Sequence, residues 1–169
     1  MTLEEAIKTA IEYEEKVTDI YFENAKNFRD PVPRKIFKVL ADEERHHVEY
    51  LEAKLKEWQE TGKVTVEKLE TIIPDKATIE ANVSQLQEKA GKQDFGDEVA
   101  IFKKALKLEV ATSNFYKKMV RELPPEDQGF FEQFVEIEEG HETIVQAEID
   151  AASGLGFWFD FMEFSLESG

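Results

Sequence analysis

A short motif, Glu-x-x-His, occurs twice in this chain, and it constrains the fold more than any other feature. The first copy contains Glu44 and His47, and the second contains Glu138 and His141, 94 residues later. Residues three positions apart lie on one face of an α-helix, so each pair can hold a common object. A phenylalanine precedes each Glu by seven positions in both copies. The repeat therefore predicts two equivalent helices with the same inward face.

The same offset of 94 residues can be applied to the rest of the chain without gaps, where it aligns Glu15 with Glu109. Glu109 is the only acidic residue in the middle of its predicted helix. Glu15 has acidic neighbours in Glu12 and Glu14, and the repeat selects Glu15 among them. Two further pairs support the alignment, namely Pro31 with Pro125 and Thr18 with Thr112. The sequence thus predicts one lone carboxylate on each of two further helices.

Length and composition limit the class of protein. A chain of 169 residues with 41% apolar residues favours one domain with one sizeable core. The net charge of -16 argues against nucleic acid and anionic membrane surfaces as partners. The absence of cysteine excludes disulfides, thiolate zinc sites and iron–sulfur clusters from these residues. Acidic residues begin at Glu4 and no apolar run is long enough for a membrane span, so we expect a soluble cytoplasmic protein.

Apolar residues recur every three to four positions in four long stretches, which is typical of amphipathic helices. The expected helices cover residues 2–29, 34–60 and 97–122, and a fourth runs from the turn at 123–126 to about residue 152. Residues 61–96 are expected to form a crossover with one short helix near 79–90. The fold class is therefore all-α. We expect a four-helix bundle over residues 1–152, built from two helical hairpins, and an aromatic docking tail over 153–169.

Hairpin geometry predicts that the four acidic positions meet. The point midway between Glu15 and Glu44 falls at the first predicted turn, and the point midway between Glu109 and Glu138 falls at the second. Residues equidistant from a turn lie at the same height in an antiparallel pair. Packing the hairpins would gather four carboxylates and two imidazoles in one buried layer, where unpaired charges are costly. Two divalent cations would cancel the charge, and iron, manganese and zinc suit these ligands.

This pattern resembles the ferritin-like di-iron carboxylate proteins, and among them the rubrerythrins. A Glu from two helices and a Glu-x-x-His from the other two is the ligand set of that class. The resemblance implies two iron ions, with manganese or zinc as alternatives, and reaction with hydrogen peroxide or dioxygen. It implies six ligands, some of them bridging: Glu15, Glu44, His47, Glu109, Glu138 and His141. The aromatic, acidic segment GFWFDFMEF also resembles the tails of rubrerythrin-related proteins.

Two departures from the rubrerythrin pattern affect the expected chemistry. Rubrerythrins usually carry another Glu one turn after the lone Glu of the third helix, and Thr112 stands there. They also carry a cysteine-bound iron, so here a separate electron-donor protein is expected. The expected function is a non-haem di-iron oxidoreductase that reduces peroxide or dioxygen, as a homodimer or larger homo-oligomer. The alternatives are a ferritin-like iron-storage protein with a ferroxidase-type centre and an oxygenase acting on an organic substrate.

Several neighbours of the expected ligands have open roles. Tyr116 lies on the same helix face as Glu109, and three roles are open for it: a hydrogen bond to a ligand, a redox-active neighbour of the site, or a core tyrosine. Its counterpart in the repeat, Phe22, has no hydroxyl. His46 is expected at the surface or behind a ligand. Gly140 is unfavourable within a helix, and either a close approach of another helix or an access path to the metals would explain it. Glu43 and Glu139 are expected to point away from the site.

Overall fold

The computed structural model describes residues 1–86, 95–156 and 158–161, and within these ranges its regular secondary structure is entirely helical. The all-α expectation is confirmed. Helix α1 continues into a short 3-10 turn, and α5 continues into a π-helical turn. The helices are α1 (Leu3–Asn24), α2 (Pro31–Thr61), α3 (Lys76–Leu86), α4 (Gly96–Glu122) and α5 (Pro125–Asp150), and the two short turns are Ala25–Asn27 and Ala151–Leu155.

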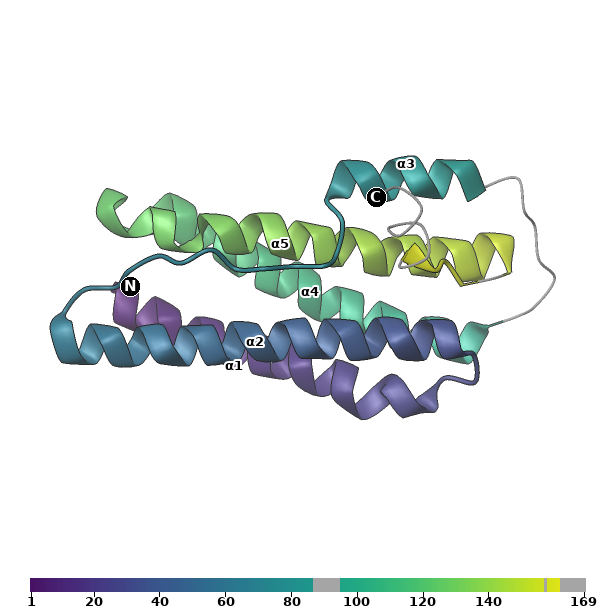
Figure 1. The fold of residues 1–169 in the computed structure, drawn as a ribbon, viewed down its shortest axis with the longest axis horizontal. Helices are drawn as coiled ribbons and strands as arrows, with labels where there is room; N and C mark the ends of the chain where they lie inside the picture. Colours follow the sequence, from purple (N-terminus) through teal and green to yellow (C-terminus); the bar gives the residue numbers. More distant parts are fainter. Residues whose placement is uncertain (87–94, 157, 162–169) are drawn as a thin grey trace.

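The four long helices form a bundle of two antiparallel hairpins (Figure 1). Helix α1 packs on α2, α4 packs on α5, and α1 also contacts α4. The segment 62–75 runs back along the bundle from the end of α2 to α3, which packs on α5. This long connection makes α1 antiparallel to α4. None of the described helices has the length and apolarity needed to cross a membrane.

The helix ends follow capping chemistry. Thr2 Oγ1 accepts a hydrogen bond from the Glu5 amide, and a Glu5 carboxylate oxygen accepts one from the Thr2 amide, which completes the expected capping box. Helix α2 begins at Pro31, earlier than expected, because Asp30 caps it and prolines cost no hydrogen bond in a first turn. Gly62 ends α2 with a φ of 71°, as predicted.

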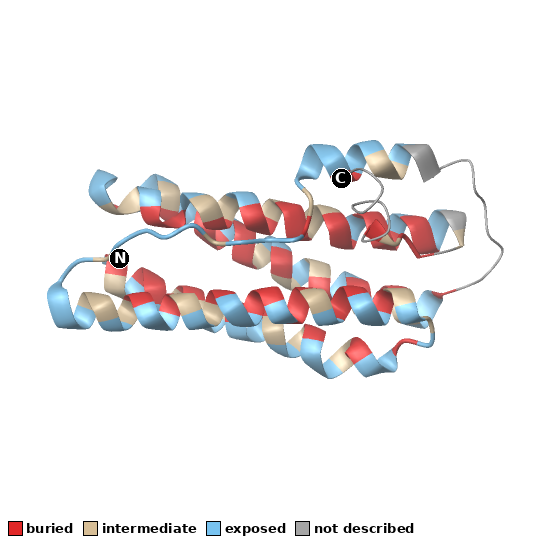
Figure 2. Ribbon diagram, in the orientation of Figure 1, coloured by how far each residue is buried: buried red, intermediate tan, exposed pale blue. Residues whose placement is uncertain are grey.

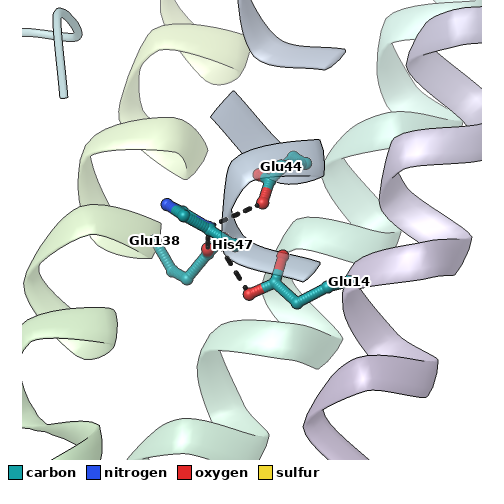
Figure 3. A group of neighbouring side chains, drawn as sticks. All are labelled: Glu14, Glu44, His47 and Glu138. Atoms are coloured by element: carbon teal, nitrogen blue, oxygen red, sulfur yellow. Dashed lines mark hydrogen bonds and ion pairs between the residues drawn. The ribbon is translucent and has the colours of Figure 1, made fainter. Parts of the chain in front are cut away.

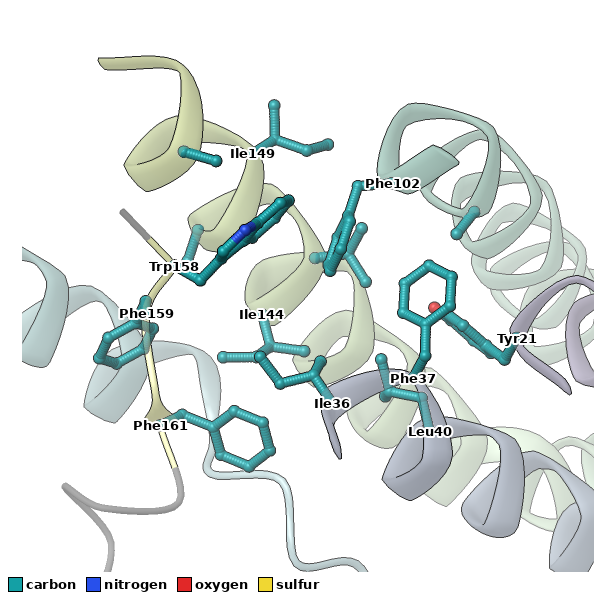
Figure 4. Close-up of a cluster of buried hydrophobic side chains, with 14 of the residues drawn as sticks. Tyr21, Ile36, Phe37, Leu40, Phe102, Ile144, Ile149, Trp158, Phe159 and Phe161 are labelled. Carbon is teal, nitrogen blue, oxygen red and sulfur yellow. The ribbon is translucent and has the colours of Figure 1, made fainter. Parts of the chain in front are cut away.

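Buried residues line the inner faces of the four long helices (Figure 2). The apolar ones form two clusters, and buried Glu and His residues lie between them. The first cluster lies towards the α1–α2 turn and includes Phe28. Phe37 and Phe102 belong to the same cluster (Figure 4). The second lies towards the opposite end and includes Phe131 and Phe134. Each long helix contributes apolar residues to both clusters, so each one passes through the polar layer at mid-length. The fold therefore places the middle of four helices around one buried point.

The aromatic tail docks on the first cluster. Trp158, Phe159 and Phe161 are 5%, 1% and 1% exposed, and the Trp158 ring stacks on Phe102 with centroids 4.7 Å apart (Figure 4). The prediction that the tail is buried is confirmed for these three residues. The other two aromatic residues of the tail, Phe157 and Phe164, lie outside the described residues.

Gly140 on α5 faces the crossover segment. A Cβ at this position would lie 3.4 Å from the Pro74 carbonyl oxygen and 3.9 Å from the Ile73 side chain. Both distances are ordinary van der Waals contacts, and the neighbour of Gly140 is the crossover segment rather than another long helix.

Candidate metal centre

Six ionisable side chains from the four long helices meet in the polar layer. All are at most 1% exposed: Glu14, Glu44, His47, Glu109, Glu138 and His141. Helix α1 contributes the first, α2 the second and third, α4 the fourth and α5 the last two. Their ligand atoms form two groups, and the atoms of each group lie within 4.8 Å of one another.

The first group surrounds the Nδ1 atom of His47 (Figure 3). This nitrogen lies 3.0 Å from Oε2 of Glu44, 3.3 Å from Oε1 of Glu138 and 3.6 Å from Oε1 of Glu14. Three carboxylates and one imidazole from α1, α2 and α5 thus face a common point. We call this group the Glu14 site.

The second group surrounds the Nδ1 atom of His141. This nitrogen lies 2.6 Å from Oε1 of Glu44, 3.7 Å from Oε2 of Glu138 and 3.8 Å from Oε1 of Glu109. We call this group the Glu109 site. Glu44 and Glu138 belong to both sites, and each turns one oxygen to either imidazole. Two carboxylates are therefore placed to bridge two cations.

The structure corrects one predicted ligand position on α1. Glu15 is exposed, and Glu14 occupies the buried position opposite Glu109. The offset of 94 holds between α2 and α5, but the buried positions of α1 and α4 are 95 residues apart, from Glu14 to Glu109. The sequence does contain a pattern that favours Glu14, because Ala10, Glu14 and Val17 continue the spacing of three and four residues between the buried positions of α1. The second hairpin is one residue shorter, and the ungapped repeat hides that difference.

Two buried tyrosines each donate a hydrogen bond to the lone carboxylate of the other hairpin. The Tyr21 hydroxyl donates to Oε1 of Glu109, and the Tyr116 hydroxyl donates to Oε1 of Glu14. Burial and the neighbouring carboxylates raise the pKa of both phenols well above the usual value, so both remain donors. The counterpart of Tyr116 is therefore Tyr21, again 95 residues away, whereas Phe22 is 73% exposed. Each tyrosine holds a carboxylate on the opposite hairpin.

Burial of so many acidic groups makes the layer bind protons strongly. Burial and the charges of Glu14 and Glu109 raise the pKa of Glu44 to about 8, and similar causes raise the pKa of Glu138 well above its usual value. Burial alone would lower the pKa of His47 and His141, but the surrounding carboxylates raise both well above the usual value. The layer therefore attracts positive charge, as protons or as cations.

The unused lone pairs of the layer fit a pair of metal ions. Among the described residues, both Glu138 oxygens and one oxygen each of Glu14 and Glu109 accept no hydrogen bond despite full burial. Buried carboxylate oxygens normally have partners. Carboxylate and imidazole ligands without thiolate suit iron, manganese and zinc. The donor set thus fits the metals that the sequence predicted.

Glu43 contacts the layer, contrary to the expectation that it points away. Its Oε2 lies 2.7 Å from Nε2 of His141, and the carboxylate is 8% exposed. Burial would raise its pKa, but the bonds from His141 and Thr71 lower it below the usual value. Sequence reasoning missed this contact because it depends on the crossover, which folds over α2. A distant segment of this kind leaves no periodic signal.

The other neighbours have ordinary surroundings. Glu139 is half-buried and pairs with Lys117 at 3.3 Å, so it points away from the layer as predicted. His46 is exposed. Thr112 is buried, and its hydroxyl donates to the Leu108 carbonyl at 2.9 Å, which keeps the hydroxyl within its own helix.

Comparison of the chain with protein-family models, with curated proteins and with solved structures gives no match.

Proposed function

We propose that this protein is a ferritin-like di-iron oxidoreductase of the rubrerythrin type, which reduces hydrogen peroxide. The observation that carries the proposal is the pair of donor sets that share Glu44 and Glu138 through different oxygens. Shared carboxylates would hold two cations close together. A site for one structural ion would need neither the second imidazole nor the bridging oxygens.

The charges of the layer favour two divalent ions. Four ionised carboxylates carry four negative charges, and two divalent cations with neutral imidazoles balance them. Without that balance, a buried charge costs several kcal/mol. Ion binding would displace the protons held by Glu44, Glu138 and both histidines. The layer therefore exchanges one kind of positive charge for another.

A pair of ferrous ions would supply two electrons, one from each ion, which balances the reduction H2O2 + 2 e− + 2 H+ → 2 H2O. The protein holds the ligands for this chemistry in place. Tyr21 and Tyr116 fix one oxygen of each lone carboxylate. The Phe134 ring lies edge-on to His47 at 5.6 Å, and the two apolar clusters close the layer above and below. These groups exclude bulk water from the reacting atoms.

Renewed reduction requires electrons from outside these residues. The 169 residues contain no cysteine, so no thiolate-bound iron can be built from them. A separate electron-transfer protein is the partner that this proposal needs. We expect single turnovers from the reduced protein alone and sustained turnover only with an added donor.

The test is stopped-flow mixing of the anaerobic, iron-loaded, reduced protein with peroxide and, separately, with dioxygen. The proposal predicts two irons per chain, one peroxide consumed per iron pair, and faster oxidation by peroxide. Faster oxidation by dioxygen, together with a large hollow assembly in sizing experiments, would replace it with the iron-storage alternative. If the protein without substitutions binds no iron, both the oxidoreductase proposal and the iron-storage alternative are wrong.

A matched pair of variants identifies the site. Glu138→Gln replaces one of the two oxygens that face the imidazoles with an amide nitrogen and removes the negative charge that both halves share, so it should abolish binding of two irons. Glu139→Gln changes the next residue, which pairs with Lys117 at 3.3 Å instead, and should leave two irons bound. Equal loss in both variants would place the metals elsewhere.

A further inference from the structure

The two imidazoles of the layer differ on the side that faces away from the carboxylates. Nε2 of His141 lies 2.7 Å from Oε2 of Glu43. Nε2 of His47 is buried and has no hydrogen-bond partner among the described residues. Applying the offset of 94 to Glu43 gives Ile137, which has no polar atom in its side chain. The two imidazoles therefore differ in their Nε2 partner because the equivalent positions 43 and 137 carry different residues.

Glu43 is itself held by the crossover. Its Oε1 accepts hydrogen bonds from the Thr71 hydroxyl at 2.8 Å and from the Ile72 amide at 2.7 Å. The same stretch continues to Pro74, which lies against Gly140 beside His141. Within the part of the crossover that the structure describes, these are the contacts that hold this carboxylate. The orientation of His141 is thus fixed through Glu43 by backbone from outside the bundle.

The other groups behind the ligands are matched between the two sites. Tyr116 bonds Glu14 in one site, and Tyr21 bonds Glu109 in the other. Glu44 and Glu138 give one oxygen to each site. Each site therefore has the same kinds of carboxylate and phenol groups, and the contact of Nε2 with Glu43 is the clearest chemical difference between the two imidazoles.

We propose that Glu43 is a positioning residue that makes the two cation sites unequal, so that the Glu109 site binds the first divalent cation more tightly. This inference rests on the proposed metal binding. A carboxylate that accepts the Nε2 proton presents Nδ1 as the free lone pair, fixes the ring and strengthens the ligand. Loss of such a partner typically lowers metal affinity by about 10- to 100-fold. His47 binds without that support.

The experiment separates the sites before it tests Glu43. Cobalt(II) titration of the metal-free full chain, followed by calorimetry and absorption, should show two steps about 10- to 100-fold apart. Glu14→Gln should leave only the Glu109 site, and Glu109→Gln should leave only the Glu14 site. Adding Glu43→Ile, which copies Ile137, should weaken binding about 10- to 100-fold in the Glu14→Gln background and leave the Glu109→Gln background unchanged.

The outcomes distinguish this inference from the proposed function. If the unaltered chain binds two cobalt ions but Glu43→Ile weakens both backgrounds equally, or neither, the inference is wrong and the metal centre stands. If the unaltered chain binds no metal, the proposed function fails as well. Glu43→Gln keeps the shape of the side chain and guards against misfolding, and it should give the same site-selective loss in smaller measure. Asp42→Asn, at an exposed neighbour, is the control and should change neither step.

Discussion

Replacing Glu14 with glutamine tests the assignment on α1 most directly, with Glu15→Gln as the matched control. Glu14 is fully buried and faces His47 at 3.6 Å, whereas Glu15 is exposed on the next helical position. Oε1 of Glu14 both faces His47 and accepts the Tyr116 hydroxyl. The glutamine side chain would keep the volume, but it would remove the negative charge and offer one carbonyl oxygen in place of two carboxylate oxygens. Only the Glu14 site should be lost, since the Glu109 site uses no atom of Glu14.

The size of the effect follows from ligand linkage. Each bound ion adds about 2.7 kcal/mol to the free energy of unfolding when its free concentration is 100 times its Kd. At a free metal concentration 100 times the Kd of the Glu14 site, Glu14→Gln should therefore remove about 2.7 kcal/mol, while the tighter Glu109 site still adds more than that. For a chain of this length each kcal/mol shifts Tm by about 2–4 °C, so the metal-dependent rise in Tm should shrink by about 5–11 °C.

The assay compares thermal unfolding of each variant with and without added metal, and metal content is measured in parallel. Subtracting the metal-free Tm cancels any direct effect of the substitution on the fold. Glu15→Gln should retain two metals and the full rise in Tm. A loss in Glu15→Gln with none in Glu14→Gln would mean that α1 presents a different face to the layer. Full retention in both variants would show that α1 supplies no ligand.

Three further predictions concern the scaffold. Phe159→Ala should lower the free energy of unfolding by about 3–5 kcal/mol in denaturant titrations, because the ring is 1% exposed. The control Phe22→Ala removes a ring that is 73% exposed and should change the free energy of unfolding by less than about 0.5 kcal/mol. Burial raises the pKa of Glu148 in the folded protein well above its ordinary 4.5, so the folded protein holds this proton more tightly than the unfolded chain. The free energy of unfolding should therefore fall by about 1.4 kcal/mol per pH unit as the pH rises from 4.5 towards the folded pKa. Glu148→Gln should flatten that slope in unfolding experiments from about pH 5.5 to 8, and an unchanged slope would contradict the reasoning. Gly140→Ala and the exposed control Gly129→Ala should each stabilise α5 by up to about 1 kcal/mol. The new Cβ at 140 would lie 3.4 Å from its nearest neighbour, which leaves room for a methyl group. Destabilisation by Gly140→Ala alone would mean that the crossover cannot shift to accept the methyl group.

Local patterns in the sequence determined the helices and most of the buried acidic layer. The three-residue spacing of Glu44 and His47, and of Glu138 and His141, places each pair on one face whatever the helix packs against. Glu109 has no acidic competitor in its helix. Caps at Thr2 and Gly62 depend on neighbours in the chain, so they too could be predicted. These features share one property: their geometry is fixed within a few turns of helix.

Tertiary packing decided everything that depends on the rotation of one helix against another. Glu14 and Glu15 differ by about 100° around the helix axis, and only the contacts of α1 with α2 and α4 fix which one turns inward. The same rotation pairs Tyr21 with Glu109. Glu43 reaches His141 because the crossover supplies Thr71 and Ile72 to its other oxygen. Contacts between segments far apart in the chain carry no periodicity, so the sequence alone could name the chemistry of the site but not its full set of neighbours.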